Sequence, residues 1–191
     1  MQGLSEGELF LGLGFLLFGL VVGLLIVWYT LRTGAPPMPS TRTMRRMLAD
    51  LLPAYPSGSI IELGSGWGGL AQQLALHYPQ HRVFGLELSP LPWLFSWAKR
   101  RALGPPNLRF VRCDFRDHPL HEVGLVVCYL NPEVMRRVEP WLRQGLAASA
   151  WVVCIGFALP GHKPVKTIKV PDMHATTLFL YQPTSGTVSV A

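Results

Sequence analysis

The stretch Ile60-Ile61-Glu62-Leu63-Gly64-Ser65-Gly66-Trp67-Gly68-Gly69 decides the fold of this chain. Residues 59–63 form a short apolar run that suits a buried parallel strand. The glycines that follow allow a sharp turn and let a ligand lie against bare backbone N–H groups. Residues 70–78 then have a helical pattern. A strand, a glycine loop and a helix in this order predict an α/β domain that binds a nucleotide-like ligand.

Strands and helices alternate on both sides of this stretch. A helix capped by Ser40 or Thr41 is expected to run to about Leu52. The elements after the glycine loop are expected as strands at 82–88, 108–113, 123–130 and 150–158, and helices at 90–103 and 133–146. This alternation predicts a Rossmann-like α/β fold, with a mostly parallel sheet and helices on both faces. The segments 164–170 and 174–181 are β-rich and predict a C-terminal antiparallel hairpin at the sheet edge.

Three acidic residues, Glu62, Glu87 and Asp114, lie at or just after the ends of successive predicted strands. The spacing Gly64-x-Gly66-x-x-Gly69 also fits a dinucleotide-binding fold. Glu62, however, stands where such a fold has an apolar strand residue, and a carboxylate there can reach the ammonium of a methionine moiety. Glu87 suits ribose hydroxyls, and Asp114 suits the amino group of adenine. Glu87 supports any nucleoside ligand, NAD included, whereas Glu62 and Asp114 favour S-adenosylmethionine (SAM) over NAD.

An uncharged run of 23 residues, Leu9–Leu31, lies near the N-terminus. At about 1.5 Å per residue it is long enough to cross a hydrocarbon core of about 30 Å. A cleaved signal peptide is the alternative, but no basic residue precedes the run and no small-x-small cleavage site follows it. The run therefore predicts a transmembrane helix over 9–31. Residues 1–8 would be a short non-cytoplasmic tail, 32–39 a Pro-rich linker, and 40–191 the methyltransferase domain.

The charges predict how the helix is oriented. Glu6 and Glu8 precede it, whereas all 17 basic residues follow it, beginning at Arg32. Basic flanks stay on the cytoplasmic side, so the domain is expected there. A bacterial inner membrane is favoured. A mitochondrial inner membrane is the alternative, although an Arg-rich transit peptide is missing.

The part after the helix has an excess of eight positive charges. Such an excess favours contact with anionic lipid, and nucleic-acid binding is the competing explanation. The basic residues come in short clusters without a nucleic-acid motif, so no nucleic-acid partner is expected. The three cysteines, Cys113, Cys128 and Cys154, are expected to be reduced core residues. Their spacing does not suit a metal, and no metal is expected.

The glycine loop and the strand-end acids Glu62, Glu87 and Asp114 resemble the cofactor-binding segments of the class I SAM-dependent methyltransferases. More narrowly, the chain is similar to membrane-anchored lysine methyltransferases of mitochondria, which modify the ADP/ATP carrier and the ATP synthase c subunit, and to an archaeal broad-specificity lysine methyltransferase. With the predicted transmembrane helix included, the resemblance covers residues 9 to about 160. The other segments that carry it are Met38–Thr41, Met47-Leu48, Ile61–Gly68, Gly85–Ser89 and Tyr129–Pro132, followed by Met135. Trp67 and Gly69 depart from the family pattern, which has an acid and a basic residue there. Asn131-Pro132 also matches the first half of an Asn-Pro-Pro-Tyr motif of methyltransferases that act on nucleobase amino groups.

The resemblance implies SAM as cofactor and a lysine side chain as methyl acceptor. The expected cofactor-binding residues follow from this resemblance and from the strand-end acids. They are Pro39, Ser40, Thr41, Glu62, Gly64, Ser65, Gly66, Trp67, Gly68, Glu87, Leu88, Asp114 and Phe115. The expected catalytic residues are Tyr129, Asn131 and Pro132. Tyr129 is the first candidate for an aromatic wall around the acceptor, ahead of Trp67 and Trp93. Asn131 could hold the acceptor amine through its side-chain oxygen.

Three functions are consistent with the sequence. The first is a membrane-anchored protein lysine methyltransferase with a membrane or membrane-associated protein as substrate. The second is a methyltransferase for a lipophilic small molecule, such as a quinone precursor or a lipid headgroup. The third is an inactive membrane adaptor, in which Trp67 fills the cofactor cleft.

Overall fold

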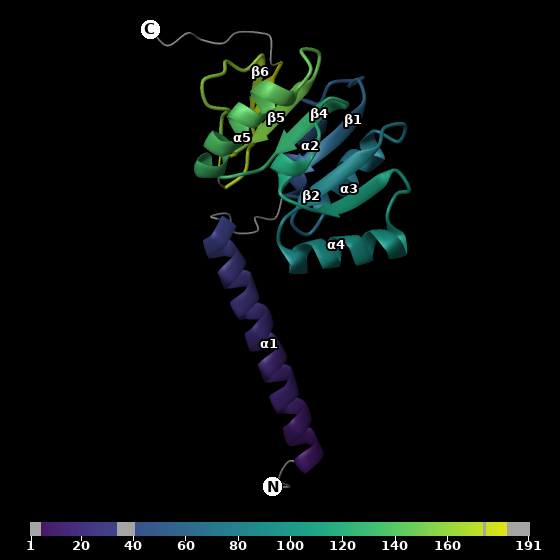
Figure 1. The fold of residues 1–191 in the computed structure, drawn as a ribbon, viewed down its shortest axis with the longest axis vertical. Coiled ribbons are helices and arrows are strands. Elements are labelled where there is room, and N and C mark those ends of the chain that lie inside the picture. Colours follow the sequence, from purple (N-terminus) through teal and green to yellow (C-terminus); the bar gives the residue numbers. More distant parts are fainter. Residues whose placement is uncertain (1–4, 34–40, 174, 183–191) are drawn as a thin grey trace. The chain divides into compact units, whose positions relative to one another are not determined.

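The computed structural model describes residues 5–33, 41–173 and 175–182. The chain divides into two compact units, residues 1–36 and 37–191. The described elements, drawn in Figure 1, are α1 (Glu6–Thr33), α2 (Arg42–Ala49), β1 (Ser59–Leu63), α3 (Gly69–His77), β2 (Val83–Glu87), α4 (Pro90–Leu103), β3 (Leu108–Arg112), η1 (Phe115–Asp117), β4 (Val123–Cys128), α5 (Pro132–Gly145), β5 (Trp151–Ile155), β6 (Lys166–Lys169) and β7 (Thr177–Tyr181).

Helix α1 belongs to the first unit and is a single straight run of 28 residues. Ser5 and Glu8 form a reciprocal capping box at its start: the Ser5 amide donates to Glu8 Oε2 at 2.8 Å, and the Glu8 amide donates to Ser5 Oγ at 3.4 Å. Residues Glu6–Leu25 have a mean hydropathy of 2.3, and none of their side chains is buried within the chain. By length and composition this helix is suited to cross a membrane.

The second unit is built on a seven-stranded sheet with the order β3-β2-β1-β4-β5-β7-β6. The first five strands in the chain are parallel, and β7 and β6 pair antiparallel to form a hairpin beside β5. The predicted Rossmann-like sheet and C-terminal hairpin are confirmed. Parallel strands are buried on both faces, which explains why β4 is apolar throughout and fully buried.

Helices cover both faces of the sheet. On one face the apolar side chains of α2 and α3, such as Met44, Leu48 and Leu74, pack on β1, and Phe110 of β3 borders the same cluster. On the other face α5 contributes Met135, Val138 and Leu142. These apolar layers fix the strand ends relative to one another, which positions the loops of the site. All three cysteines are free thiols, and Cys128 and Cys154 are opposite each other on β4 and β5.

Several elements are shorter than the sequence predicts, among them β4, which ends at Cys128 and not at residue 130. Helix α2 ends at Ala49, not near Leu52, because the chain turns at Asp50 ahead of Pro53, and the residue before a proline is disfavoured in helical conformation. Strand β5 ends at Ile155 because Gly156 adopts a positive φ of 82°, which a strand does not accommodate. Residues 6–8 of the predicted tail and residues 32–33 of the predicted linker belong to α1, and residues 1–4 and 34–39 lie outside the described residues.

Candidate functional site

The candidate site lies at the carboxyl edge of the parallel strands. Strand β1 pairs with β2 on one side and with β4 on the other, so the order of the strands reverses between β1 and β4. In open α/β sheets a crevice for ligands forms at such a switch point. The glycine loop follows β1 and Tyr129 follows β4, so both lie at this edge.

The glycine loop is held in a conformation that other residues rarely adopt. Gly64, Gly66 and Gly68 have φ values of 67°, 50° and 75°. At Gly68 an added Cβ would lie 2.5 Å from Cζ of Phe110 and 2.8 Å from Cβ of Ser96, so α4 and β3 approach the loop too closely for any side chain there. The loop is closed internally by the Gly68 amide, which donates to the Ser65 carbonyl at 2.9 Å.

Glu87 links the end of β2 to this loop. Its Oε2 accepts a 2.8 Å hydrogen bond from the Gly66 amide, and its Oε1 accepts a 2.7 Å bond from the Ser89 amide. Glu87 is buried. A carboxylate has about four acceptor positions, so two such bonds leave capacity for the hydroxyls of a ribose. The predicted role of Glu87 therefore fits this geometry.

Glu62 lies within the same edge and is only 4% exposed. Burial raises the pKa of its carboxyl group well above 4.5, and the nearby Glu87 adds to the rise, while a hydrogen bond with the Ala71 backbone and the charge of Arg45 oppose it. Its Oε2 is buried without a hydrogen-bond partner among the described residues, as is Oγ of Ser65. A buried acceptor without a partner costs free energy. An ammonium group, such as that of the SAM methionine moiety, would satisfy it.

Asp114 has a different environment. Its carboxylate accepts bonds from Arg116 at 2.6 Å and 3.0 Å and also caps η1 through the Arg116 amide. This hydrogen bonding to Arg116 lowers the pKa of Asp114. Asp114 is thus ionised, with part of its acceptor capacity used locally. Phe115, which follows it, packs against Trp141 of α5 at a ring-centroid distance of 5.5 Å.

Trp67 occupies the position where the family pattern has an acid. Its indole lies edge-on against Phe95 of α4, with ring centroids 5.3 Å apart, and it is 40% exposed. The side chain is therefore packed against α4 and remains partly open to solvent. Leu88, directly after β2, is also exposed at this edge.

Tyr129 and Asn131 follow β4. Tyr129 is half-buried, and Cε2 of its ring lies 3.6 Å from where a Cβ on Gly156 would be, at the end of β5. Burial, with the charge of Asp172 adding to it, raises the pKa of its hydroxyl group. Oδ1 of Asn131 accepts a 2.9 Å hydrogen bond from the Val134 amide, so this residue is the N-cap of α5, and Pro132 is the first helical residue. The cap occupies the side-chain oxygen that the sequence assigned to the acceptor amine.

Of the N-terminal motif, Pro39 and Ser40 lie outside the described residues. Thr41 is described and is the N-cap of α2, because its Oγ1 accepts a 3.1 Å hydrogen bond from the Met44 amide. Thr41 is exposed. Its observed role is to begin the helix that carries Arg45.

Two residues at the site were not among those expected from the sequence. Arg45, on α2, is close enough to Glu62 to affect its pKa, and its Nε is buried without a partner among the described residues. Ser89 contributes a backbone amide to Glu87. The sequence did contain an indication for Arg45: it directly follows the core residue Met44 in an amphipathic helix, so it is expected near the core of the domain. Backbone donors such as that of Ser89 leave no signal in residue identity.

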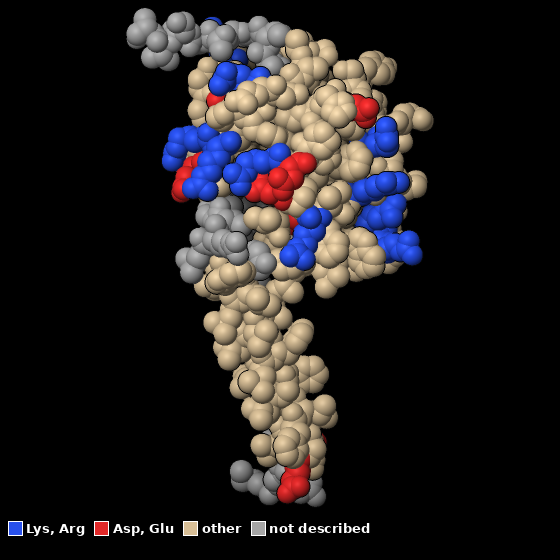
Figure 2. All heavy atoms as spheres, in the orientation of Figure 1, with Lys and Arg blue, Asp and Glu red and all other residues tan. Residues whose placement is uncertain are grey.

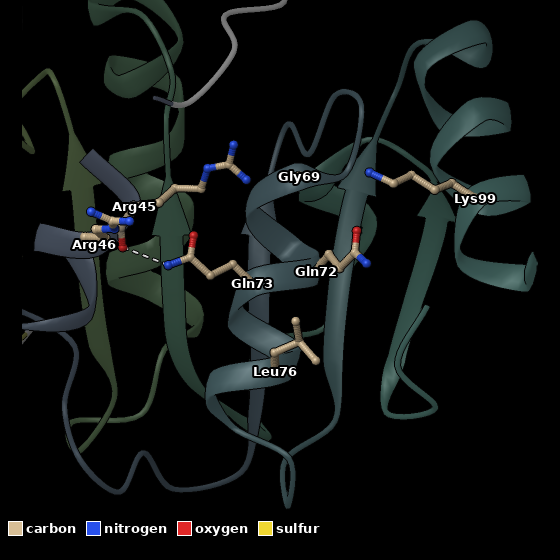
Figure 3. Close-up of a pocket in the computed structure, with 7 residues that line it drawn as sticks. All are labelled: Arg45, Arg46, Gly69, Gln72, Gln73, Leu76 and Lys99. Carbon is tan, nitrogen blue, oxygen red and sulfur yellow. Dashed lines mark hydrogen bonds between the residues drawn. The ribbon is translucent and has the colours of Figure 1, made fainter. Parts of the chain in front are cut away.

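A surface pocket of about 330 Å³ runs along the outer side of α3. It is lined by Gly69, Gln72, Gln73 and Leu76 from α3, with Arg45 and Arg46 on one side and Lys99 of α4 on the other (Figure 3). Figure 3 shows Arg45 and Lys99 extending toward Gly69 from opposite sides. The pocket adjoins the glycine loop at Gly69.

The strand order and the glycine loop define the class I SAM-dependent methyltransferases, and solved structures agree. An RNA methyltransferase from Salinibacter ruber in complex with S-adenosyl-L-homocysteine superposes with a TM-score of 0.66 at 20% identity, over 78% of this chain and 95% of that one. Precorrin-6y C5,15-methyltransferase from Geobacter metallireducens GS-15 superposes with a TM-score of 0.58 at 12% identity, over 74% of this chain and 87% of that one. At these identities the likeness shows the fold alone.

The sequence profile of the ANTKMT methyltransferase domain matches residues 62–166, more than half of the chain, and this protein belongs to that family, which is a family of lysine methyltransferases. Trans-aconitate 2-methyltransferase from Deinococcus radiodurans is 38% identical over 72 residues. The match spans about a quarter (26%) of that relative's length. The chain is therefore a member of this methyltransferase family.

Proposed function

We propose that this protein is a membrane-anchored methyltransferase that transfers methyl groups to lysine side chains of a membrane or membrane-associated protein. The observation that carries the proposal is that a domain of a lysine methyltransferase family shares one chain with α1, a 28-residue apolar helix. Between Glu6 and Leu25 its side chains are not buried by any of the residues that the structure describes. Such a helix is stable in a bilayer, where its apolar surface is solvated by lipid.

The site residues would act by binding and positioning. SAM supplies an activated methyl group on a sulfonium. Glu62 would pair with its ammonium, Glu87 with the ribose hydroxyls and Asp114 with the adenine amino group. We expect the glycine loop to lie against the methionine part, because its backbone is bare there. Gly64, Ser65, Gly66 and Gly68 form this contact, with Leu88 and Phe115 as apolar neighbours of the base.

The acceptor lysine must lose its proton before it can attack. Desolvation lowers the pKa of an amine, so an aromatic, water-poor pocket provides neutral lysine without a dedicated base. Tyr129 is the proposed wall of that pocket, because it lies beside the switch point and is already half-buried. The enzyme would then hold the donor and the acceptor in line at about 3–3.5 Å.

The acidic residues in the first turn of α1, Glu6 and Glu8, and the basic residues from Arg32 onward favour a cytoplasmic domain. A bacterial inner membrane is the proposed location, with the mitochondrial inner membrane as the alternative. The proposed partners are lipid, through α1, and a protein substrate; nucleic acid is not a proposed partner.

The test supplies SAM with a labelled methyl group to membranes from cells that lack this protein, with and without the purified full chain. Acid-stable label in methyl-lysine of a membrane protein is the expected result. Label that extracts into organic solvent would instead favour a lipophilic small-molecule substrate, and label in nucleic acid would contradict the proposal. The Glu87→Ala variant is the negative control. No calorimetric SAM binding, or SAM binding that Glu87→Ala leaves unchanged, would leave the adaptor hypothesis in place.

A further inference from the structure

Helix α4 presents an apolar face away from the sheet. Its inner side is formed by the buried Pro92 and Ser96. On the outer side Leu94 and Phe95 are 50% and 51% exposed, and Trp97 is 43% exposed. A surface helix of a soluble domain normally places polar residues there. Leu103, at the end of the helix, is 88% exposed as well. Four large apolar side chains exposed on one helix indicate a surface that a lipid phase or another molecule covers.

Cations border this face at the C-terminal half of the helix. Lys99 and Arg101 are exposed, and Lys99 reaches over the α3 pocket toward Arg45 (Figure 3). Of the seven residues that line this pocket, three are basic and none is acidic. Figure 2 shows Lys and Arg atoms gathered at the side of the domain where α4 ends, next to uncharged atoms. Trp, Phe and Leu on one face with Lys and Arg beside them are typical of helices that lie in a membrane interface.

We propose that α4 lies on the surface of an anionic bilayer, with Leu94, Phe95 and Trp97 among the lipid headgroups and with Lys99 and Arg101 against lipid phosphates. This inference rests on the proposed anchoring by α1. Eight residues separate Thr33 from Arg42, a reach of at most about 30 Å at 3.3–3.6 Å per residue, so an anchored domain is confined near the membrane surface. The basic excess complements an anionic leaflet, and lipid is the occupant that both the charge and the tether favour.

Docking through α4 would also affect the site. Phe95 of the apolar face contacts Trp67 of the glycine loop. A bilayer against α4 therefore holds the glycine loop close to the headgroups. The lysines within reach would then be those that a substrate protein presents at the membrane surface.

The experiment uses the full chain in vesicles with a fluorescent probe on a single reactive cysteine. Cys113→Ser removes the only native cysteine that is not buried. The probe, a nitrobenzoxadiazole (NBD) group, is attached at Leu94→Cys. The matched control is Tyr55→Cys, in the loop before β1, where the native side chain is 91% exposed. Vesicles contain phosphatidylcholine alone or phosphatidylcholine with phosphatidylglycerol.

In the anionic vesicles we expect the probe at position 94 to show blue-shifted emission, quenching by spin-labelled lipid and protection from aqueous iodide. The probe at position 55 should remain open to iodide. In phosphatidylcholine alone, or in a Lys99→Glu/Arg101→Glu background, the protection at position 94 should decrease. Equal iodide access at positions 94 and 55 in anionic vesicles overturns the inference.

Two further outcomes also overturn it. One is protection of position 94 only after a membrane protein is added. The other is loss of protection when the chain is diluted to fewer than one copy per vesicle, which would indicate a second copy as the occupant. Alkaline carbonate extraction reports separately on α1. If the chain resists extraction while position 94 stays exposed, the docking of α4 is contradicted and the anchoring by α1 is not. If the chain is extracted, the proposed anchoring by α1 is contradicted as well.

Discussion

The backbone amide of Gly66 donates a 2.8 Å hydrogen bond to Oε2 of Glu87, which lies 21 residues further along the chain. This bond joins the glycine loop after β1 to the end of β2. The second oxygen of the same carboxylate is tied to Ser89. One side chain therefore sets the shape of the loop and offers acceptors toward the crevice.

Replacing this carboxylate should weaken cofactor binding. Hydrogen bonds to charged groups contribute about 1.5–3 kcal/mol, so we expect Glu87→Ala to raise the Kd for SAM by roughly 10–100-fold or more. Titration calorimetry of the full chain in detergent measures the effect. Glu122→Ala, an exposed acid before β4, is the control and should leave the Kd unchanged. Equal affinities of Glu87→Ala and wild type would remove Glu87 from the site.

The raised pKa of Glu62 makes folding depend on pH. The folded state holds the Glu62 proton more tightly than the unfolded state, whose pKa is near 4.5. The free energy of unfolding should therefore decrease as the pH rises above 4.5 toward the raised value. Glu62→Gln keeps the shape and cannot ionise, so its stability should decrease less over the same range. Urea unfolding at a series of pH values compares the two, and parallel profiles would contradict the expectation.

The same group should couple cofactor binding to pH in the opposite sense. A bound ammonium favours ionised Glu62, so binding releases its proton. The affinity of wild type for SAM should therefore increase as the pH rises above 4.5, and that of Glu62→Gln should be weaker and flatter. Calorimetry in buffers with different ionisation enthalpies counts the released protons. The absence of proton release from wild type would show that Glu62 does not contact the ammonium.

Gly68 should tolerate no side chain. Its φ of 75° strains any L-residue by about 1–2 kcal/mol, and the close approach of Phe110 adds a packing cost of about 1–3 kcal/mol. Gly161 is a matched control, because its φ is 73° but an added Cβ there would meet nothing within 4 Å. Gly68→Ala should lower the Tm clearly more than Gly161→Ala does. Similar losses in the two variants would show that the packing at Phe110 relaxes freely.

Asn131 allows the structural and the catalytic roles to be separated. Loss of the N-cap in Asn131→Ala should reduce stability by about 0.5–2 kcal/mol. Asn131→Ser keeps a capping oxygen but lacks the amide group. If Asn131 only caps α5, the serine variant should match wild type in both Tm and methyl transfer. A normal Tm with reduced kcat would instead assign the amide to the acceptor amine.

Tyr129 is tested through its ring. Tyr129→Phe keeps the aromatic wall and should retain methyl transfer, whereas Tyr129→Ala should reduce kcat/KM for the protein substrate while leaving the Kd for SAM largely unchanged. Kinetics with the substrate identified by labelling provide the measurement. A loss of activity in Tyr129→Phe would assign a role to the hydroxyl group, whose pKa burial raises.

The sequence by itself determined the fold class and the loop that identifies the methyltransferase. Glycines are needed at 64, 66 and 68 because the backbone there adopts positive φ angles. Apolar strand segments alternate with segments of helical pattern along the chain. Both features are local and can be read from residue identity. The apolar helix α1 is equally local, because length and hydropathy alone make it suited to span a membrane.

Only the tertiary structure decided how the acids differ from one another. Glu62, Glu87 and Asp114 have the same functional group in the sequence, yet one is buried with an acceptor left open, one is bound to two loop amides and one is paired with Arg116. The role of Asn131 as a cap, the direction of Trp67 toward Phe95 and the exposed apolar face of α4 were likewise decided by packing. A carboxylate's environment depends on residues that are distant in the chain, and these are brought together only when the sheet forms.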